Sequence, residues 1–464
     1  RTLMTTKSPD ILQEQINSII TLFSNGQIQE ALDAVETLIK SYPNDPVLYN
    51  ISGACYAGLG QFDAAVKSYK KSLAIKPDYA EAHNNLGVTL QELGQLDVAV
   101  KSYEQALAIK PDYAEAFNNL GITLKELGQL DTAVKSYEKK LTIKPDFAEA
   151  HNNLGITLQE LGQLNEAVKN YEKAIAIKPD YADAHNNLGI ALKELGQLDA
   201  AVKSYEQALT INPNCAEAHF NLGDILRELG QLDASVKSYE KAQTIKPDHV
   251  GAHNNLGIAL KELGQLDEAL NSFKKSIVIQ PDFAEAHNNL GNVLKSLGQF
   301  DAAVKSYEKT LTIKPDFADA YNNLGITYMD LGQEDKAIKY CEKALTIKPD
   351  FADAYNTLGI AHMNLGQLDA AINCYKKALV IDPDYAVAHY NLGMTLQTLG
   401  QLDEALKSYI HANILKPDLN YILGAILNTK MHLCIWDDLP NYLIELKNKI
   451  SNNEKVITPF TMLG

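Results

Sequence analysis

The chain repeats itself every 34 residues, and this period limits its possible folds more than any other feature. Twelve of the 16 prolines recur at this spacing, from Pro43 to Pro417. One glycine column keeps the same spacing from Gly26 to Gly400, and a second glycine column runs beside it. A fixed period of this length is typical of a stack in which each unit is one supersecondary motif.

The period divides the 464 residues into three parts. We place twelve repeats over residues 12–419, after a lead of residues 1–11 and before a tail of residues 420–464. The first three residues precede Met4 and resemble a cloning remnant. Length alone would suggest about three globular domains. Internal self-similarity overrides that estimate, so we expect one array of repeats.

Residues 80–113 show what one repeat contains. Leu86 and Leu90 belong to an apolar stripe with helical spacing, and Gly94 ends that helix because glycine accepts a left-handed backbone. Asp97 is expected to cap a second helix with its own apolar stripe, which a proline ends. The apolar faces are too wide to bury within one pair of helices. The predicted fold is therefore all-α, a superhelical solenoid of twelve helix-turn-helix repeats with a helical tail that caps it or links it onward.

Composition excludes several classes of protein. The 58 acidic and 42 basic side chains give a net charge of −16, which argues against a nucleic-acid binder. No run approaches the ~18–20 apolar residues of a membrane span, and the start lacks the pattern of a signal peptide. The five cysteines are scattered and form no Cys-x-x-Cys pair, so neither a disulfide framework nor a zinc site is expected. These features predict a reduced, cytoplasmic protein.

Two columns of side chains that are able to do chemistry are better explained by packing. Seven histidines share one position of the repeat, but Phe117 also occupies it, and phenylalanine cannot replace a ligand or a catalytic base. Successive repeats lie about 8–10 Å apart, much farther than a zinc–nitrogen bond. A tyrosine column that includes Tyr103 is interpreted as core. The histidines are His83, His151, His185, His219, His253, His287 and His389.

No phosphate-binding loop or catalytic triad motif stands outside this repeat pattern. We therefore assign no catalytic residue and no metal ligand, and we expect no cofactor.

The opposite face of the first helix carries asparagine where solubility alone would favour Glu, Lys or Gln. A carboxamide both donates and accepts hydrogen bonds, as a peptide group does. We therefore predict that one asparagine column holds the backbone of an extended polypeptide. Its members are Asn85, Asn119, Asn153, Asn187, Asn221, Asn255, Asn289 and Asn323.

A second asparagine column lies one residue earlier in the repeat, from Asn84 to Asn356, and an apolar column that includes Ile122 lies beside both. Together they suggest a mixed groove of amides and apolar side chains. The alternative interpretation is structural, with asparagines that bond neighbouring helices and hold no ligand.

The repeat length and the Leu-Gly…Tyr…Ala…Pro framework, seen in Gly87, Tyr103 and Pro111, resemble the tetratricopeptide repeat family. This resemblance implies a right-handed superhelix in which the first helix of each pair lines the concave wall. The first repeat departs from the pattern, with Ile19 in place of the packing glycine and Gln15 in place of the aromatic residue or histidine. These departures suit a unit that caps the end of the stack.

Within that family, the asparagine column resembles the one in O-linked N-acetylglucosamine transferases, where the residue before Leu-Gly contacts the substrate backbone. The tail contains Cys434-Ile435-Trp436-Asp437-Asp438 and then Pro459-Phe460. This order is similar to the segment that joins the repeats to the catalytic domain in bacterial proteins of that type. The resemblance implies a substrate-recognition arm, with the glycosyltransferase domain and its UDP-N-acetylglucosamine site beyond Gly464 and no catalytic activity in this chain.

Two other classes of function stay open. One is a free-standing scaffold for multiprotein assembly, with no link to glycosylation and a purely structural asparagine column. The other is an enzyme within this chain, which no motif favours. The expected partner is an extended or unfolded protein segment, and neither nucleic acid nor a membrane is expected. The sequence sets no oligomeric state.

Overall fold

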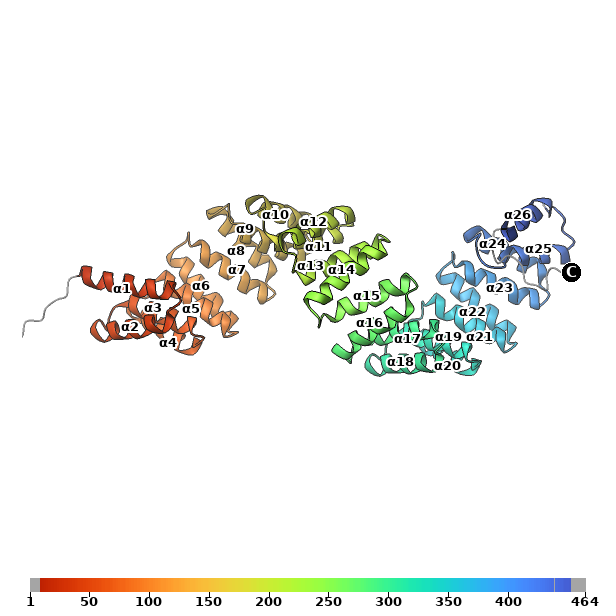
Figure 1. The fold of residues 1–464 in the computed structure, drawn as a ribbon, viewed down its shortest axis with the longest axis horizontal. Helices are drawn as coiled ribbons and strands as arrows, with labels where there is room; N and C mark the ends of the chain where they lie inside the picture. The colour runs from red at the N-terminus through yellow and green to blue at the C-terminus, as the bar shows by residue number, and fades with distance from the viewer. Residues whose placement is uncertain (1–8, 438, 452–464) are drawn as a thin grey trace, which may run out of the picture. The chain divides into compact units, whose positions relative to one another are not determined.

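The computed structural model describes residues 9–437 and 439–451, and every regular element in those residues is an α-helix (Figure 1). The first helix has 16 residues, and after it helices of 14 and 13 residues alternate through the array, so each repeat is a pair of short helices. The bounds of the first thirteen are α1 (Pro9–Ser24), α2 (Ile28–Ser41), α3 (Pro46–Gly58), α4 (Phe62–Ile75), α5 (Ala80–Glu92), α6 (Leu96–Ile109), α7 (Ala114–Glu126), α8 (Leu130–Ile143), α9 (Ala148–Glu160), α10 (Leu164–Ile177), α11 (Ala182–Glu194), α12 (Leu198–Ile211) and α13 (Ala216–Glu228).

The remaining helices continue the pattern and end in the tail. They are α14 (Leu232–Ile245), α15 (Val250–Glu262), α16 (Leu266–Ile279), α17 (Ala284–Ser296), α18 (Phe300–Ile313), α19 (Ala318–Asp330), α20 (Glu334–Ile347), α21 (Ala352–Asn364), α22 (Leu368–Ile381), α23 (Ala386–Thr398), α24 (Leu402–Leu415), α25 (Ile422–His432) and α26 (Leu439–Ser451). The twelve predicted repeats correspond to α1–α24.

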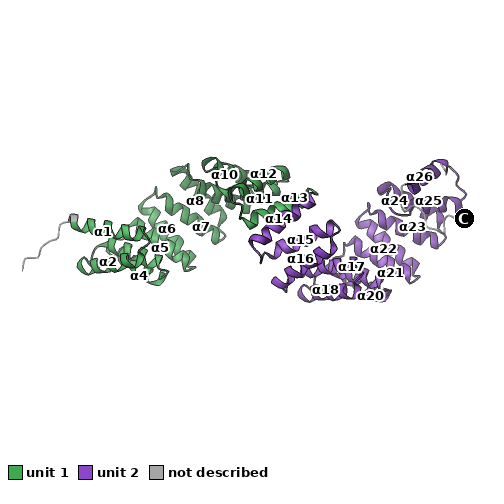
Figure 2. Cartoon of the chain, in the orientation of Figure 1, with its two compact units in different colours: residues 1–230 green, residues 231–464 purple. Residues whose placement is uncertain are grey.

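The helices fall into two compact units, residues 1–230 with α1–α13 and residues 231–464 with α14–α26 (Figure 2). Within each unit a helix packs against the helices just before and after it in sequence. The first helices of successive repeats also touch, as α5 touches α7 in the first unit and α19 touches α21 in the second. Each unit is therefore a stack held together by contacts between neighbours, as expected of a solenoid.

The turn inside a repeat follows from glycine. Gly94 has φ +70°, a left-handed backbone that only glycine adopts without strain, and α6 starts two residues later. The expectation that Asp97 caps α6 is wrong, because Gln95 occupies the capping position and forms no side-chain cap hydrogen bond. Asp97 lies instead in the first turn, where its negative charge faces the positive end of the helix.

The core confirms the packing interpretation of the tyrosine column. Tyr103 is fully buried against α5, and a Cβ atom added to Gly87 would lie 2.6 Å from its ring. The second glycine column therefore exists because the ring of the second helix lies directly on the backbone of the first. The other fully buried tyrosines of the column are Tyr137, Tyr171, Tyr205, Tyr239, Tyr307, Tyr375 and Tyr409.

Each end of the array is covered differently. At the start, α1 buries Ile16 and Ile19 in one cluster with residues of α2 and α3, and leaves Ile20 exposed. At the other end, Ile422 and Ile426 of α25 pack into the cluster around Tyr409. The helical tail thus continues the core of the last repeat.

Trp436 does not seal the last apolar face, since 55% of its surface is exposed. The helix α25 covers that apolar face instead, because it packs directly on the last repeat. Residues 1–8, Asp438 and Pro459-Phe460, which belong to the predicted lead and tail motif, lie outside the described residues.

Candidate functional site

The two asparagine columns lie on the first helices, and their side chains bond to each other from one repeat to the next. Each of the eight predicted members is half-buried. In six of them the amide Nδ2 donates to the Oδ1 of the asparagine 35 residues earlier. These bonds are Asn85 to Asn50 (3.2 Å), Asn119 to Asn84 (3.1 Å), Asn187 to Asn152 (3.1 Å), Asn221 to Asn186 (3.3 Å), Asn289 to Asn254 (3.1 Å) and Asn323 to Asn288 (3.1 Å).

The accepting residue is usually buried deeper than the donor. Asn152, for example, is only 4% exposed, whereas Asn187, which donates to it, is half-buried. A bond to a fixed, buried acceptor holds the donor amide in one orientation. That amide still has its own Oδ1 and a second N–H for another partner. The structural and ligand-binding interpretations of the columns are therefore compatible.

Two predicted members depart from this pattern. Asn118 Oδ1 is buried and has no hydrogen-bond partner, although Asn153 stands 35 residues after it. Asn255 accepts from Asn254 Nδ2 at 3.0 Å, and the corresponding earlier position is Phe220 rather than asparagine. The bonding pattern thus depends on the residues that occupy both columns.

Charged and amide side chains near the end of the first helices also pair across repeats. Gln91 donates to Glu126 at 3.0 Å, and Lys125 forms an ion pair with Glu160 at 3.1 Å, again with a separation of 35 residues. The Lys125–Glu160 pair is substantially exposed, so its contribution to stability is small. These charged groups are therefore partly neutralised by each other and offer little selectivity for a ligand.

A hollow of about 660 Å3 lies on this face in the second unit, over α17, α19 and α21. We call it the asparagine hollow. It gathers members of both asparagine columns, the neighbouring apolar column and two aspartates. Its lining residues are Asn288, Asn292, Phe317, Asp319, Asn322, Asn323, Ile326, Met329, Phe351, Asp353, Asn356, Thr357, Ile360 and Tyr385.

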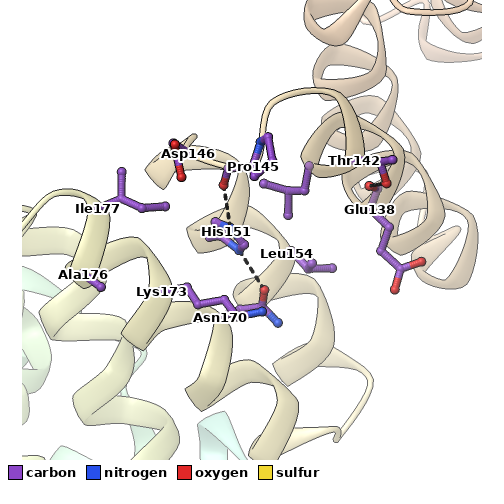
Figure 3. Close-up of a pocket in the computed structure, with 11 residues that line it drawn as sticks. Glu138, Thr142, Pro145, Asp146, His151, Leu154, Asn170, Lys173, Ala176 and Ile177 are labelled. Atoms are coloured by element: carbon purple, nitrogen blue, oxygen red, sulfur yellow. Dashed lines mark hydrogen bonds between the residues drawn. The ribbon is translucent and has the colours of Figure 1, made fainter.

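The histidine column has a structural role. His83 Nε2 lies 3.0 Å from the carbonyl oxygen of Pro77, and the same contact recurs at six further histidines. Because a carbonyl only accepts, the ring donates and fixes the loop between repeats. Figure 3 shows this contact at His151, whose other nitrogen lies 3.1 Å from Asn170 Oδ1. Burial lowers the pKa of His253 in this column, which favours the neutral ring.

No group of three or more His, Cys, Asp or Glu side chains in the described residues is arranged to hold a metal ion. The cysteines are unpaired, and burial raises the pKa of the Cys55 thiol to about 11. None of the described helices is both long and apolar enough to cross a membrane.

The bonds between neighbouring first helices match the structural alternative, and the 35-residue spacing between the columns would have indicated which asparagines pair. The aspartate pair Asp319 and Asp353, which line the asparagine hollow, was not predicted from the sequence. Most other repeats also have an acidic residue at this position. Only the surrounding side chains therefore distinguish Asp319 and Asp353 from those residues.

The fold and this face define a helical repeat scaffold of the class that binds other proteins. A family model described as TPR repeat matches more than half of the chain, over residues 53–94, 90–128, 123–162, 158–196, 259–298, 291–332 and 363–400. Models described as tetratricopeptide repeat match residues 186–250, 318–351, 340–373 and 386–419. The chain belongs to the tetratricopeptide repeat family.

Individual relatives share only parts of the chain. TPR repeat-containing protein MJ0940 of Methanocaldococcus jannaschii is 37% identical over 75 residues, which are 16% of this chain and 23% of that protein. The chain therefore spans about a quarter of the length of this curated relative.

Among solved structures, YrrB, described as a TPR protein with an unusual peptide-binding site, is 26% identical and has a TM-score of 0.36, over 40% of this chain and 95% of YrrB. MamA is 32% identical with a TM-score of 0.33, over 37% of this chain and 93% of MamA. A tetratricopeptide repeat protein from Parabacteroides merdae is 20% identical with a TM-score of 0.45, over 54% of this chain and 98% of that one.

Proposed function

We propose that the face formed by the two asparagine columns, the asparagine face, binds an extended polypeptide through its main chain. The observation that carries this proposal is the bond between the columns. A half-buried amide such as Asn187 is held by Asn152 at 3.1 Å and keeps one acceptor and one donor for a ligand. A binding group fixed before the ligand arrives loses less conformational entropy on binding.

Affinity on such a face accumulates from many weak contacts. A single amide hydrogen bond contributes about 0.5–1.5 kcal/mol net. Several asparagines therefore have to act together along one extended segment. Because each contacts the ligand main chain, this part of the binding is insensitive to the ligand's side chains.

A more specific function is the substrate-recognition arm of an O-linked N-acetylglucosamine transferase-like protein. The asparagine columns and the tail motif around Cys434 and Trp436 support it by resemblance. The exposure of Trp436 is also compatible with a neighbouring domain that covers it, because a large exposed aromatic ring is a frequent contact surface. Reading the gene downstream of the Gly464 codon tests this version, and a stop codon there would favour the free-standing scaffold.

The free cysteines also favour a reducing compartment, and we propose the cytoplasm.

The test of polypeptide binding is the triple variant Asn187→Ala, Asn221→Ala and Asn289→Ala. Reduced, carboxamidomethylated ribonuclease A serves as an unfolded probe in calorimetric titration. We expect the variant to bind it at least tenfold more weakly, since three fixed amides at about 0.5–1.5 kcal/mol each are lost. Circular dichroism should show unchanged helix content.

The matched control removes three hydrogen bonds from second helices instead. Ser204, Ser238 and Ser306 each donate to the carbonyl four residues earlier at 3.0–3.1 Å. Their triple replacement by alanine should leave the affinity unchanged. Equal affinity of the asparagine variant and the native protein would leave the columns a structural role only.

A further inference from the structure

The asparagine hollow contains a buried acceptor without a donor, as the first unit does at Asn118. Asn322 is only 6% exposed, lines the hollow, and its Oδ1 has no hydrogen-bond partner. The cause lies 35 residues later, where Thr357 replaces the asparagine that donates in other repeats. Thr357 Oγ1 donates instead to the carbonyl oxygen of Asp353 in its own helix, at 2.9 Å.

An unpaired buried carbonyl is unfavourable, because it has lost its hydration and gained nothing in return. A ligand that brings an N–H into the hollow would remove this cost. The hollow therefore favours a donor at a defined place.

The acidic charge at the hollow is less compensated than in three other repeats. In those repeats the acidic residue near the start of the first helix pairs with a lysine 29 residues later, as Glu115 pairs with Lys144 at 2.8 Å. Glu81 with Lys110 and Glu285 with Lys314 do the same, each at 3.7 Å.

Asp353 has this position in α21, but the residue 29 positions later is Asp382, which cannot supply a cation. Its Oδ1 accepts instead from the Tyr385 hydroxyl at 2.7 Å. Burial raises the pKa of Tyr385, and the bond to Asp353 raises it further, so the hydroxyl stays protonated and donates.

The residues that line the hollow favour a ligand with a cationic group at the end of an apolar chain. Asp319 and Asp353 supply two carboxylates, and the 14 lining residues include no lysine or arginine. Lys348, 29 residues after Asp319, lies over the Phe351 ring at 4.7 Å from its centroid. Ile326 and Ile360 offer an aliphatic wall, against which long charged side chains pack their methylene groups.

We propose that the asparagine hollow binds an arginine side chain of the polypeptide held on the asparagine face, and lysine more weakly. Arginine fits better because its planar guanidinium has several donors, so that it reaches Asn322 Oδ1 and the Asp353 carboxylate together and also stacks on aromatic rings. This inference rests on the proposed function, because the hollow would then select one side chain of a segment that the amides hold by its main chain.

The test uses a series of fluorescein-labelled 13-residue peptides of serine and threonine with one central guest residue, which is arginine, lysine, methionine or glutamate. Fluorescence anisotropy measures the dissociation constant for each. We expect the arginine peptide to bind roughly tenfold more tightly than the methionine peptide, with lysine between them and glutamate weakest.

Two variants test the residues. Asp353→Asn removes the charge, and Thr357→Asn supplies Asn322 with a donor from within the chain. Both should abolish most of the preference for arginine over methionine. Thr357→Asn should at the same time raise the thermal unfolding temperature, so weaker arginine binding by this variant cannot be ascribed to unfolding.

The control is Asp183→Asn. It removes the same charge from the equivalent position of a repeat in which Asn186 Oδ1 already accepts from Asn221, so the arginine preference should persist.

The outcomes separate the two proposals. Peptides that bind with the same affinity for all guests, in the native protein and in both variants, would contradict the arginine site and leave main-chain binding intact. If no guest peptide binds the native protein, both the arginine site and main-chain binding are wrong.

Discussion

Lys140 is the residue that departs most from its column. The corresponding positions of neighbouring repeats hold Ala106 and Ala174, which are fully buried. Lys140 is 3% exposed, and its Nζ lies 3.4 Å from the centroid of the Phe147 ring. Burial lowers the pKa of this amine from 10.5 to about 8, while Glu115 and Glu149 oppose the shift. At neutral pH the chain therefore holds a charged amine at a buried position where the neighbouring repeats have only the methyl group of alanine.

We expect Lys140→Ala to stabilise the protein by about 1–3 kcal/mol at pH 7. The sign follows from the lowered pKa. Below pH 8 the folded protein must hold the unfavourable ammonium, and this cost disappears as the pH rises from about 8 towards 10.5, where the unfolded chain also loses the proton. The gain should therefore be smaller at pH 10 than at pH 7, as measured by urea unfolding at both values.

Lys139→Ala provides the control, because Lys139 is exposed and next in sequence. It should change the free energy of unfolding by less than about 0.5 kcal/mol at either pH. A stabilisation by Lys140→Ala that is the same at pH 7 and pH 10 would mean that packing, and not charge, is the cause.

At the scale of the helix pair, one contact sets how closely the two helices approach. The backbone of the first helix packs directly on an aromatic ring of the second helix. A Cβ atom added to Gly291, for example, would lie only 2.5 Å from the Tyr307 ring. In the repeat of α19 and α20 the ring is absent, and a Cβ on Gly325 would meet the Cys341 sulfur at 2.5 Å instead. The Cys341 side chain is smaller than a tyrosine ring, and the substitution Cys341→Ala removes its sulfur from the space above Gly325.

A double-mutant cycle tests this contact. Gly325→Ala alone should lower the free energy of unfolding by about 1–3 kcal/mol through the clash with the Cys341 sulfur. In a Cys341→Ala background the same change should be neutral, or stabilising by up to about 1 kcal/mol, because alanine favours helix over glycine. Chemical unfolding of the four proteins gives the coupling energy.

Gly291→Ala combined with Cys341→Ala is the matched control. The Tyr307 ring remains in place, so this glycine substitution should be destabilising in both backgrounds. Equal costs of Gly325→Ala with and without the sulfur would contradict the contact.

At the scale of the whole molecule, stability comes from a chain of local contacts. Within each unit, the described helices pack mainly against near neighbours in sequence, and the last repeat is covered by α25. Such an array has no residue on which all the others depend. Parts of it should therefore fold alone if their apolar ends are covered.

The fragment of residues 250–464, which contains α15–α26, should be helical and unfold cooperatively when measured by circular dichroism. The shorter fragment of residues 250–419 lacks α25 and leaves Leu406 and Tyr409 without Ile422. It should unfold at a lower urea concentration or associate through the exposed face. Equal stability of the two fragments would contradict a capping role for α25.

The sequence predicted the helices, the turns and the core because these depend on residues close together in the chain. Gly94 ends its helix as expected, and Tyr103 lies in the core. The cap at Asp97 was predicted wrongly, because a shift of two residues in the start of a helix is decided by the geometry of the turn. The role of the asparagine columns in peptide binding stays a prediction. Bonds between asparagines of neighbouring helices were one sequence-based alternative, and only the structure showed which asparagines pair.

The sequence by itself determined a stack of helix pairs, since the 34-residue period and the helical spacing of apolar residues are properties of the chain alone. Only the tertiary structure decided which polar groups find partners. The offset between stacked first helices brings Asn323 onto Asn288, and the same offset places Thr357 where it leaves Asn322 Oδ1 unpaired. A hydrogen bond requires atoms within about 3 Å, and repeat spacing sets neighbours only to within a helix diameter.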